Sequence, residues 1–141
     1  MNGSCLCGSI AFEISVDTLR AYQCHCSLCK KQSGSSSNSA TLVEQSSFRL
    51  IKGHSFIKSW VKESGFRSDF CSHCGSPVPN PVRDLGLVWI PLGLLPINVQ
   101  PQEVVHLCTS TLSSWHLVAD HSKQYEALPD LNSLIDLLQI K

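Results

Sequence analysis

The cysteines of this 141-residue chain are grouped rather than scattered. Seven of the eight fall in three short segments, namely Cys5-Leu6-Cys7-Gly8, Cys24-His25-Cys26-Ser27-Leu28-Cys29 and Cys71-Ser72-His73-Cys74-Gly75. Thiols spaced this closely bind a metal ion or form disulfides, so they tie distant parts of a chain together. The N-terminus lacks the pattern of a secretory signal. We therefore expect a cytoplasmic, reducing setting, in which clustered cysteines bind metal more often than they form disulfides.

The first and third groups each supply two ligands and end in a glycine. The spacing in the third group is that of a zinc knuckle, in which the glycine permits the turn that directs backbone N–H groups at the sulfurs. Structural zinc takes four ligands in a tetrahedron. Pairing Cys5 and Cys7 with Cys71 and Cys74 therefore predicts one closed structural zinc site.

The middle group has three thiols and no fourth cysteine nearby. Three protein ligands with one open position are the arrangement of a catalytic zinc, in which water or a substrate occupies the vacancy. A thiolate-rich site also favours zinc over magnesium or calcium. The sequence thus predicts a second, catalytic zinc held by Cys24, Cys26 and Cys29. Lys30 and Lys31 follow directly and would attract an anionic ligand.

Other interpretations of the cysteines stay open. Two or three disulfides are one, and an iron–sulfur cluster, which usually takes four thiolates, is another. A third is a purely structural pair of zinc sites, with His25, His73 or Cys108 completing the middle group. Cys108 ends an apolar run, which favours a small buried hydrophobe. Three other histidines are isolated in the sequence, and we expect each on the surface or in the core rather than in a site: His54, His116 and His121.

The composition limits the classes of partner that this chain is expected to bind. The formal net charge is zero, and the sequence has no basic stripe, so nucleic acid and acidic membrane surfaces are not expected as partners. The longest apolar runs are short and are broken by Gly and Pro, which argues against a membrane span. With 43% hydrophobic residues, the chain can bury a core. We expect one zinc-binding domain over residues 1–141.

The hydrophobic pattern predicts a mainly β, mostly antiparallel fold with a short C-terminal helix. Ser9–Val16 alternates as a half-buried strand does. Asp130 is a candidate N-cap for a final amphipathic helix. We expect hairpins across 48–70, an extended loop across the prolines of 76–81, and all three tryptophans in the core. The other predicted strands are Ser39–Val43, Phe48–Ile51, Phe56–Val61, Phe66–Phe70, Leu87–Leu92 and Val104–Cys108.

Taken together, the motifs resemble the glutathione-dependent formaldehyde-activating enzyme (Gfa-like) family. The matching motifs are C-x-C-G, C-H-C-x-x-C followed by basic residues and Ser-Gly-Ser, and F-C-x-x-C-G-S. The similarity continues through the Val-His-Leu segment at 105–107, Trp115, Asp120, Tyr125 and Pro129. It implies an Mss-four-like (β-tent) fold of twisted antiparallel sheets around a structural zinc. It also implies the same division of ligands between a structural and a catalytic zinc.

The family's named reaction joins formaldehyde to the glutathione thiol, and its class is carbon–sulfur lyase. Our primary hypothesis is accordingly a zinc-dependent enzyme acting on a thiol–aldehyde adduct, with a glutathione-like thiol and an aldehyde as partners. Three thiolates lower the Lewis acidity of a zinc ion, which favours a thiol over water as the fourth ligand. The alternative is a non-catalytic zinc-binding protein-interaction module of the same fold.

Overall fold

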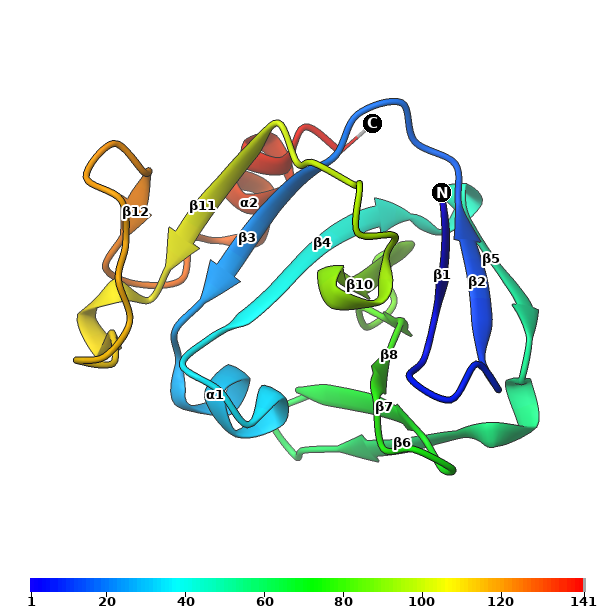
Figure 1. The fold of residues 1–141 in the computed structure, drawn as a ribbon. Helices are drawn as coiled ribbons and strands as arrows, with labels where there is room; N and C mark the ends of the chain where they lie inside the picture. Colours follow the sequence, from blue (N-terminus) through cyan, green and yellow to red (C-terminus); the bar gives the residue numbers. More distant parts are fainter. Residues whose placement is uncertain (141) are drawn as a thin grey trace.

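Three twisted β-sheets make up most of the computed structural model, which describes residues 1–140. In Figure 1 the sheets are set at angles to one another, and the helices α1 and α2 lie toward one edge of the view. The first sheet has the order β1-β2-β5, with β1 Asn2–Ser4, β2 Ala11–Ile14 and β5 Phe48–Lys52. The sheet at the bottom of the view has the order β6-β7-β8, with β6 Ile57–Val61, β7 Arg67–Cys71 and β8 Pro77–Val78.

The largest sheet has six strands in the order β12-β11-β3-β4-β10-β9. Their bounds are β12 Gln124–Tyr125, β11 Glu103–Leu107, β3 Arg20–Cys24, β4 Asn38–Glu44, β10 Leu87–Pro91 and β9 Asn80–Pro81. The two α-helices are α1 Ser27–Ser33 and α2 Leu131–Leu138. Short 3-10 turns cover Gln45–Ser47, His54–Phe56, Leu92–Leu94 and Thr109–Thr111. Among the described residues, no helix is long and apolar enough to cross a membrane.

The mainly β prediction and the C-terminal helix are confirmed. Alternation along β2 buries Phe12 and Ile14 completely, as the period of two requires. The Asp130 carboxylate accepts a hydrogen bond from the backbone N–H of Ser133 at 3.0 Å, so it caps α2 as expected. A single domain over 1–141 stays a prediction, and its last residue lies outside the described residues.

The expected run of hairpins over 48–70 is half correct. β6 and β7 do pair as antiparallel neighbours. β5 pairs instead with β2, in a different sheet. This pairing places the Phe48 ring 5.8 Å from the Phe12 ring, against the buried core. The sequence pattern did not reveal this because burial against a distant strand decides the partner.

The mostly antiparallel prediction is confirmed, and β11 is the exception, because it runs parallel to both β3 and β12. One further expectation needs correction. Trp60 and Trp115 were expected in the core but are 56% and 68% exposed. Trp60 lies on β6, an edge strand whose residues after Ile57 are all exposed. The proline segment is extended as expected, but it is not simply a loop, since β8 and β9 are two-residue strands. Both lie at sheet edges, where a missing N–H is tolerated.

The strand β3 positions the middle cysteine group, although the sequence pattern did not predict it. It lies between β4 and β11 and ends at Cys24. Its polar residues are accommodated by pairing, since the Thr41 hydroxyl donates to the Arg20 carbonyl and the Gln23 amide donates to the Ser39 hydroxyl. The chain then enters α1 directly, which brings the next two cysteines of the group next to the strand end.

Gly53 lies in the connection between the first and third sheets, where its backbone closely approaches the residues before β2. Its φ is 92°, and a Cβ there would collide with the Ser9 carbonyl oxygen and lie 2.8 Å from the Ile10 Cα. Gly34, which ends α1, has φ 65° but open space around it. We expect Gly34→Ala to cost the left-handed backbone penalty alone, about 1–2 kcal/mol, and Gly53→Ala to cost clearly more. Urea unfolding of both variants measures the difference, and equal losses would contradict the close approach.

Candidate metal centres

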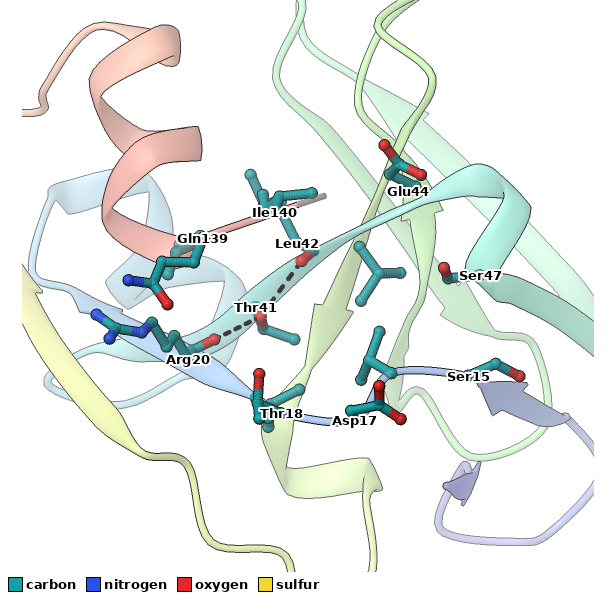
Figure 2. A pocket seen from close by; sticks show the side chains of 14 residues that line it. Ser15, Asp17, Thr18, Arg20, Thr41, Leu42, Glu44, Ser47, Gln139 and Ile140 are labelled. Carbon is teal, nitrogen blue, oxygen red and sulfur yellow. Dashed lines mark hydrogen bonds between the residues drawn. The ribbon is translucent and has the colours of Figure 1, made fainter.

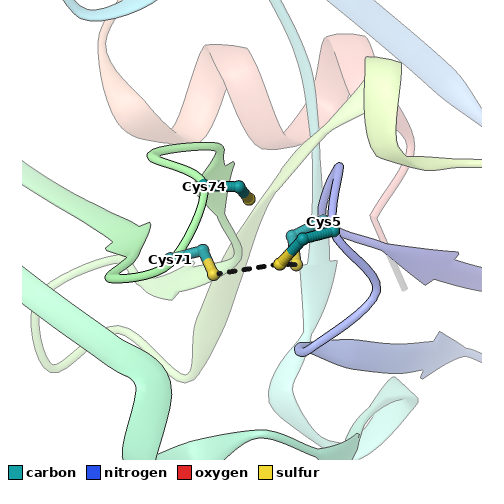
Figure 3. Close-up of side chains that lie close together, drawn as sticks. Cys5, Cys71 and Cys74 are labelled. Atoms are coloured by element: carbon teal, nitrogen blue, oxygen red, sulfur yellow. Dashed lines mark hydrogen bonds between the residues drawn. The ribbon is translucent and has the colours of Figure 1, made fainter.

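The cysteines of the first and third groups meet in space. The thiols of Cys5, Cys7, Cys71 and Cys74 all lie within 4.8 Å of one another. Figure 3 shows that Cys5 comes from the turn between β1 and β2, whereas Cys71 and Cys74 come from the end of β7 and the turn after it. The glycines that close the two turns have φ values of 74° and 75°, as the knuckle pattern predicts.

The spacing of these four sulfurs fits a zinc ion. Sulfurs bound to one tetrahedral zinc lie roughly 3.8 Å apart, because each Zn–S bond is about 2.3 Å. In the structure, Cys7 Sγ lies 3.6 Å from Cys5 Sγ and 3.8 Å from Cys71 Sγ. Cys5 and Cys71 also belong to a hydrophobic cluster, so an ion here would lie partly inside the core.

Hydrogen bonds join the two turns around this site. The Ser76 hydroxyl accepts from the Leu6 backbone N–H at 3.0 Å and lies 3.3 Å from Cys74 Sγ. The Ser9 hydroxyl lies 3.2 Å from His73 Nδ1. His73 therefore belongs to this site's surroundings, and the alternative in which it completes the middle group is wrong. Such outer contacts orient metal ligands.

The middle group also comes together, from consecutive pieces of backbone. The thiols of Cys24, Cys26 and Cys29 lie within 4.8 Å of one another. Cys24 ends β3, Cys26 is the N-cap of α1, and Cys29 lies in its first turn, where its backbone N–H donates to Cys26 Sγ at 3.5 Å. The structure thus keeps four thiols in one place and three in another, and both groups could hold zinc.

Cys108 lies beside the three-thiol group, against the edge of the core. It is half-buried, it packs against the buried cluster that contains Cys24, and its Sγ is 4.0 Å from Cys24 Sγ. The last three residues of β11 before it are buried, and Cys108 follows the strand with φ 58°. The prediction of a small buried hydrophobe is therefore correct in part, whereas its position next to Cys24 was not predicted.

A third cluster was not predicted at all. One ring nitrogen from each of His25, His106 and His116 lies within 4.8 Å of the others. His25 and His106 are almost completely buried, at 0% and 6% exposure. His116 is isolated in the sequence but not in space. His106 and His116 follow His25 by 81 and 91 residues, a separation that gives no local spacing signal, and the pairing of β3 with β11 is what brings His106 to His25.

Comparison with known proteins shows to which family this chain belongs. The model of the family described as glutathione-dependent formaldehyde-activating enzyme matches residues 1–111. The chain belongs to this family. A solved Rhodobacter sphaeroides protein from the Northeast Structural Genomics effort shares the fold, with a TM-score of 0.58 and 21% identity over 75% of this chain and 99% of that chain. No curated protein matches the chain in sequence.

The resemblance to the glutathione-dependent formaldehyde-activating family is therefore confirmed, and with it the prediction of twisted sheets in the β-tent manner. The matched range contains all eight cysteines, including Cys108. It also contains His25 and His106 but ends before His116. All eight cysteines are free thiols in the structure, so each is available as a ligand.

Within each of the two cysteine groups, the neighbouring side chains shift the pKa values of the thiols. In the three-thiol group, hydrogen bonding from the Cys29 thiol lowers the pKa of Cys24 to about 6, while the same contact raises the pKa of Cys29. In the four-thiol group, the Ser76 hydroxyl lowers the pKa of Cys74 to about 5, and burial raises the pKa of Cys71 to about 11. Neighbouring thiolates repel, so a dication is what allows all members of such a group to ionise.

The immediate surroundings of the three thiols are apolar. Cys24 belongs to a buried cluster with Leu107 and Leu134, and Tyr22 packs against that cluster. Burial raises the pKa of Tyr22, which keeps its phenol neutral. The Lys30 ammonium is tied to the Thr111 carbonyl, so it lies in a defined position one residue after Cys29.

Among the described residues, two of the larger hollows have no cysteine in their lining. One, of about 420 Å³, is lined by β4, the start of β3 and the end of α2. Figure 2 shows Thr41 and Arg20 in its wall, at the opposite end of β3 from Cys24. The other, of about 550 Å³, includes Arg67 and Arg83. Neither has a described cysteine in its lining, so neither is assigned to the thiol chemistry.

Proposed function

We propose that this chain catalyses the joining of the glutathione thiol to formaldehyde, which places it among carbon–sulfur lyases. One observation carries the proposal. In a member of the formaldehyde-activating family, three thiols lie within 4.8 Å of one another, apart from a complete four-thiol group. The four-thiol group has the ligand number of a structural zinc, and the three-thiol group has that of a catalytic one.

In this proposal Cys24, Cys26 and Cys29 would hold one zinc ion, which would take the substrate sulfur as a further ligand. When bound, zinc would keep a substrate thiol ionised at neutral pH. The residues themselves do the positioning. β3 and the first turn of α1 hold the three sulfurs on a rigid framework, and the apolar cluster behind Cys24 limits the access of water.

The reaction balances without any further reactant. The sulfur lone pair forms the new C–S bond to the formaldehyde carbon as the carbonyl π electrons move to oxygen. That oxygen takes up one proton, and the thiol has released one. The product is a hydroxymethyl thioether, and the reverse reaction breaks the same C–S bond. Binding the thiol beside the carbonyl gains rate chiefly through proximity.

Charge supports a thiol rather than water as the fourth ligand. Three thiolates make a zinc site net negative, which lowers its Lewis acidity. The Lys30 and Lys31 side chains in the last turn of α1 supply the nearest positive charge in the sequence, on the same helix as Cys29. They suit an anionic thiol such as glutathione. Basic residues at a helix C-terminus also stabilise the helix itself.

Cobalt substitution tests the proposal directly. Glutathione added to the cobalt-substituted protein is expected to increase the thiolate-to-cobalt absorption, because a fourth sulfur joins the three-thiol site. S-methylglutathione, which has no free thiol, should leave the spectrum unchanged. The matched variant Cys29→Ser should lose the increase. An unchanged spectrum with glutathione would overturn the mechanism, and one zinc per chain, confined to the four-cysteine site, would favour the non-catalytic binding module.

A further inference from the structure

The three histidines are arranged closely enough to share one ion. His25 Nε2 lies 3.0 Å from His106 Nδ1. The ring centroids are 5.3 Å apart for His25 and His106, 4.6 Å for His25 and His116, and 6.1 Å for His106 and His116. The His116 ring stands edge-on to His25, with 76° between the planes. Each ring can therefore direct a nitrogen toward the space between them.

The pairing of β3 with β11 explains why this cluster is separate from the thiols. Leu107 pairs with Cys24 and His106 pairs with Gln23, so alternation puts His106 and Cys24 on opposite faces of the ladder. The His25 backbone N–H donates to the Leu107 carbonyl at 2.9 Å, which continues the ladder by one residue. His25 therefore faces the same way as His106. The residues on either side of His25, Cys24 and Cys26, belong to the three-thiol group.

The distances fit a metal ion bound through imidazole. Two nitrogens on one tetrahedral zinc lie roughly 3.3 Å apart, since each Zn–N bond is about 2.0–2.1 Å. The Ser36 hydroxyl lies 2.6 Å from His116 Nδ1, a contact of the kind that orients a metal-binding imidazole. Within the described residues, the fully buried His25 Nδ1 has no hydrogen-bond partner.

We propose that His25, His106 and His116 bind a divalent first-row transition metal ion such as Zn²⁺, at a site distinct from both cysteine groups. Binding replaces the hydrogen bond between His25 Nε2 and His106 Nδ1. The proton between these two nitrogens moves, by exchange with solvent, to the other nitrogen of the ring that carries it, so both imidazoles stay neutral and each offers a lone pair to the ion. Imidazole ligands suit zinc, copper, cobalt and nickel and do not suit magnesium or calcium. A fourth position remains for water.

The ion would join a loop to the large sheet. His25 and His106 lie at the sheet, whereas His116 comes from the segment 112–123 between the turn Thr109–Thr111 and β12. The His116 backbone N–H donates to the Ser113 carbonyl at 2.9 Å, a local turn that presents the ring. The cluster has two possible explanations, a metal site or a plain hydrogen bond between two buried histidines. The hydrogen bond needs no third imidazole, so a role for His116 distinguishes the metal site from it.

Metal counting tests the site. The zinc-saturated wild-type protein, freed of excess metal by gel filtration, should contain three zinc ions per chain if both cysteine groups are filled. His116→Ala should contain one fewer, while His121→Ala, an exposed histidine of the same segment, should match the wild type. His116 is only half-buried, so its loss should leave the fold intact, as a circular dichroism melt can check. Equal zinc content in His116→Ala and the wild type would overturn the site.

A cobalt titration gives an independent readout. When both cysteine groups are already filled with zinc, added Co²⁺ should produce visible d–d bands without thiolate charge transfer, because its ligands are imidazoles. These bands should disappear in His116→Ala and persist in His121→Ala. Absence of the bands in the wild type would also overturn the site. The glutathione-dependent increase in thiolate absorption belongs to the other group, so each proposal can fail without the other.

Discussion

Cys71→Ser is expected to leave the chain unfolded or to lower its melting temperature sharply. Cys71 is fully buried, and its sulfur lies 3.8 Å from Cys7 Sγ in the four-thiol group. Structural zinc supplies on the order of 10 kcal/mol of folding free energy, which is as large as the whole stability of an ordinary domain. The group joins the first and third sheets, so its loss releases both. Circular dichroism melts with zinc counting measure the effect.

Cys26→Ser is the matched control for this prediction. It should remove the metal of the three-thiol group and leave the fold, because serine is itself a favourable N-cap and can replace the Cys26 sulfur that accepts from the Cys29 N–H. A strong chelator should unfold both the wild type and Cys26→Ser. If the two substitutions cost equal stability, the division into a structural and a second site is wrong.

Local spacing carried most of what the sequence predicted correctly. A pair of cysteines closed by glycine specifies its own turn, and both turns have the expected positive φ at Gly8 and Gly75. The Asp130 cap and the alternation of β2 are likewise properties of a few adjacent residues. For the same reason the three middle cysteines, within six residues of one another, could be expected to converge before any fold was known.

Distant pairing accounts for what the sequence did not reveal. The parallel contact of β11 with β3 sets which side chains share a face, and no motif records it. This contact brings His106 to His25, and it places Cys108, the residue after β11, 4.0 Å from Cys24. The apolar run before Cys108 indicates burial, but it does not indicate which distant thiol lies beside it.

Cys29→Ser is expected to abolish catalysis of the thiol–formaldehyde reaction while the protein stays folded. Cys29 supplies one of only three thiols in its group, and the other cluster of four does not depend on it. We expect the rate above the uncatalysed reaction to fall by at least roughly 100-fold, because bound metal contributes several kcal/mol of charge stabilisation. Exchange NMR of glutathione with formaldehyde measures the catalysed rate directly.

Cys108→Ser distinguishes an open site from a closed one. Cys108 is the nearest additional thiol, 4.0 Å from Cys24 Sγ, but it does not belong to the group of three whose thiols all lie within 4.8 Å of one another. With an open fourth position, Cys108→Ser should keep both its metal and its rate. If Cys108→Ser instead loses metal as Cys29→Ser does, four thiolates close the site, no position remains for glutathione, and the proposed catalysis fails.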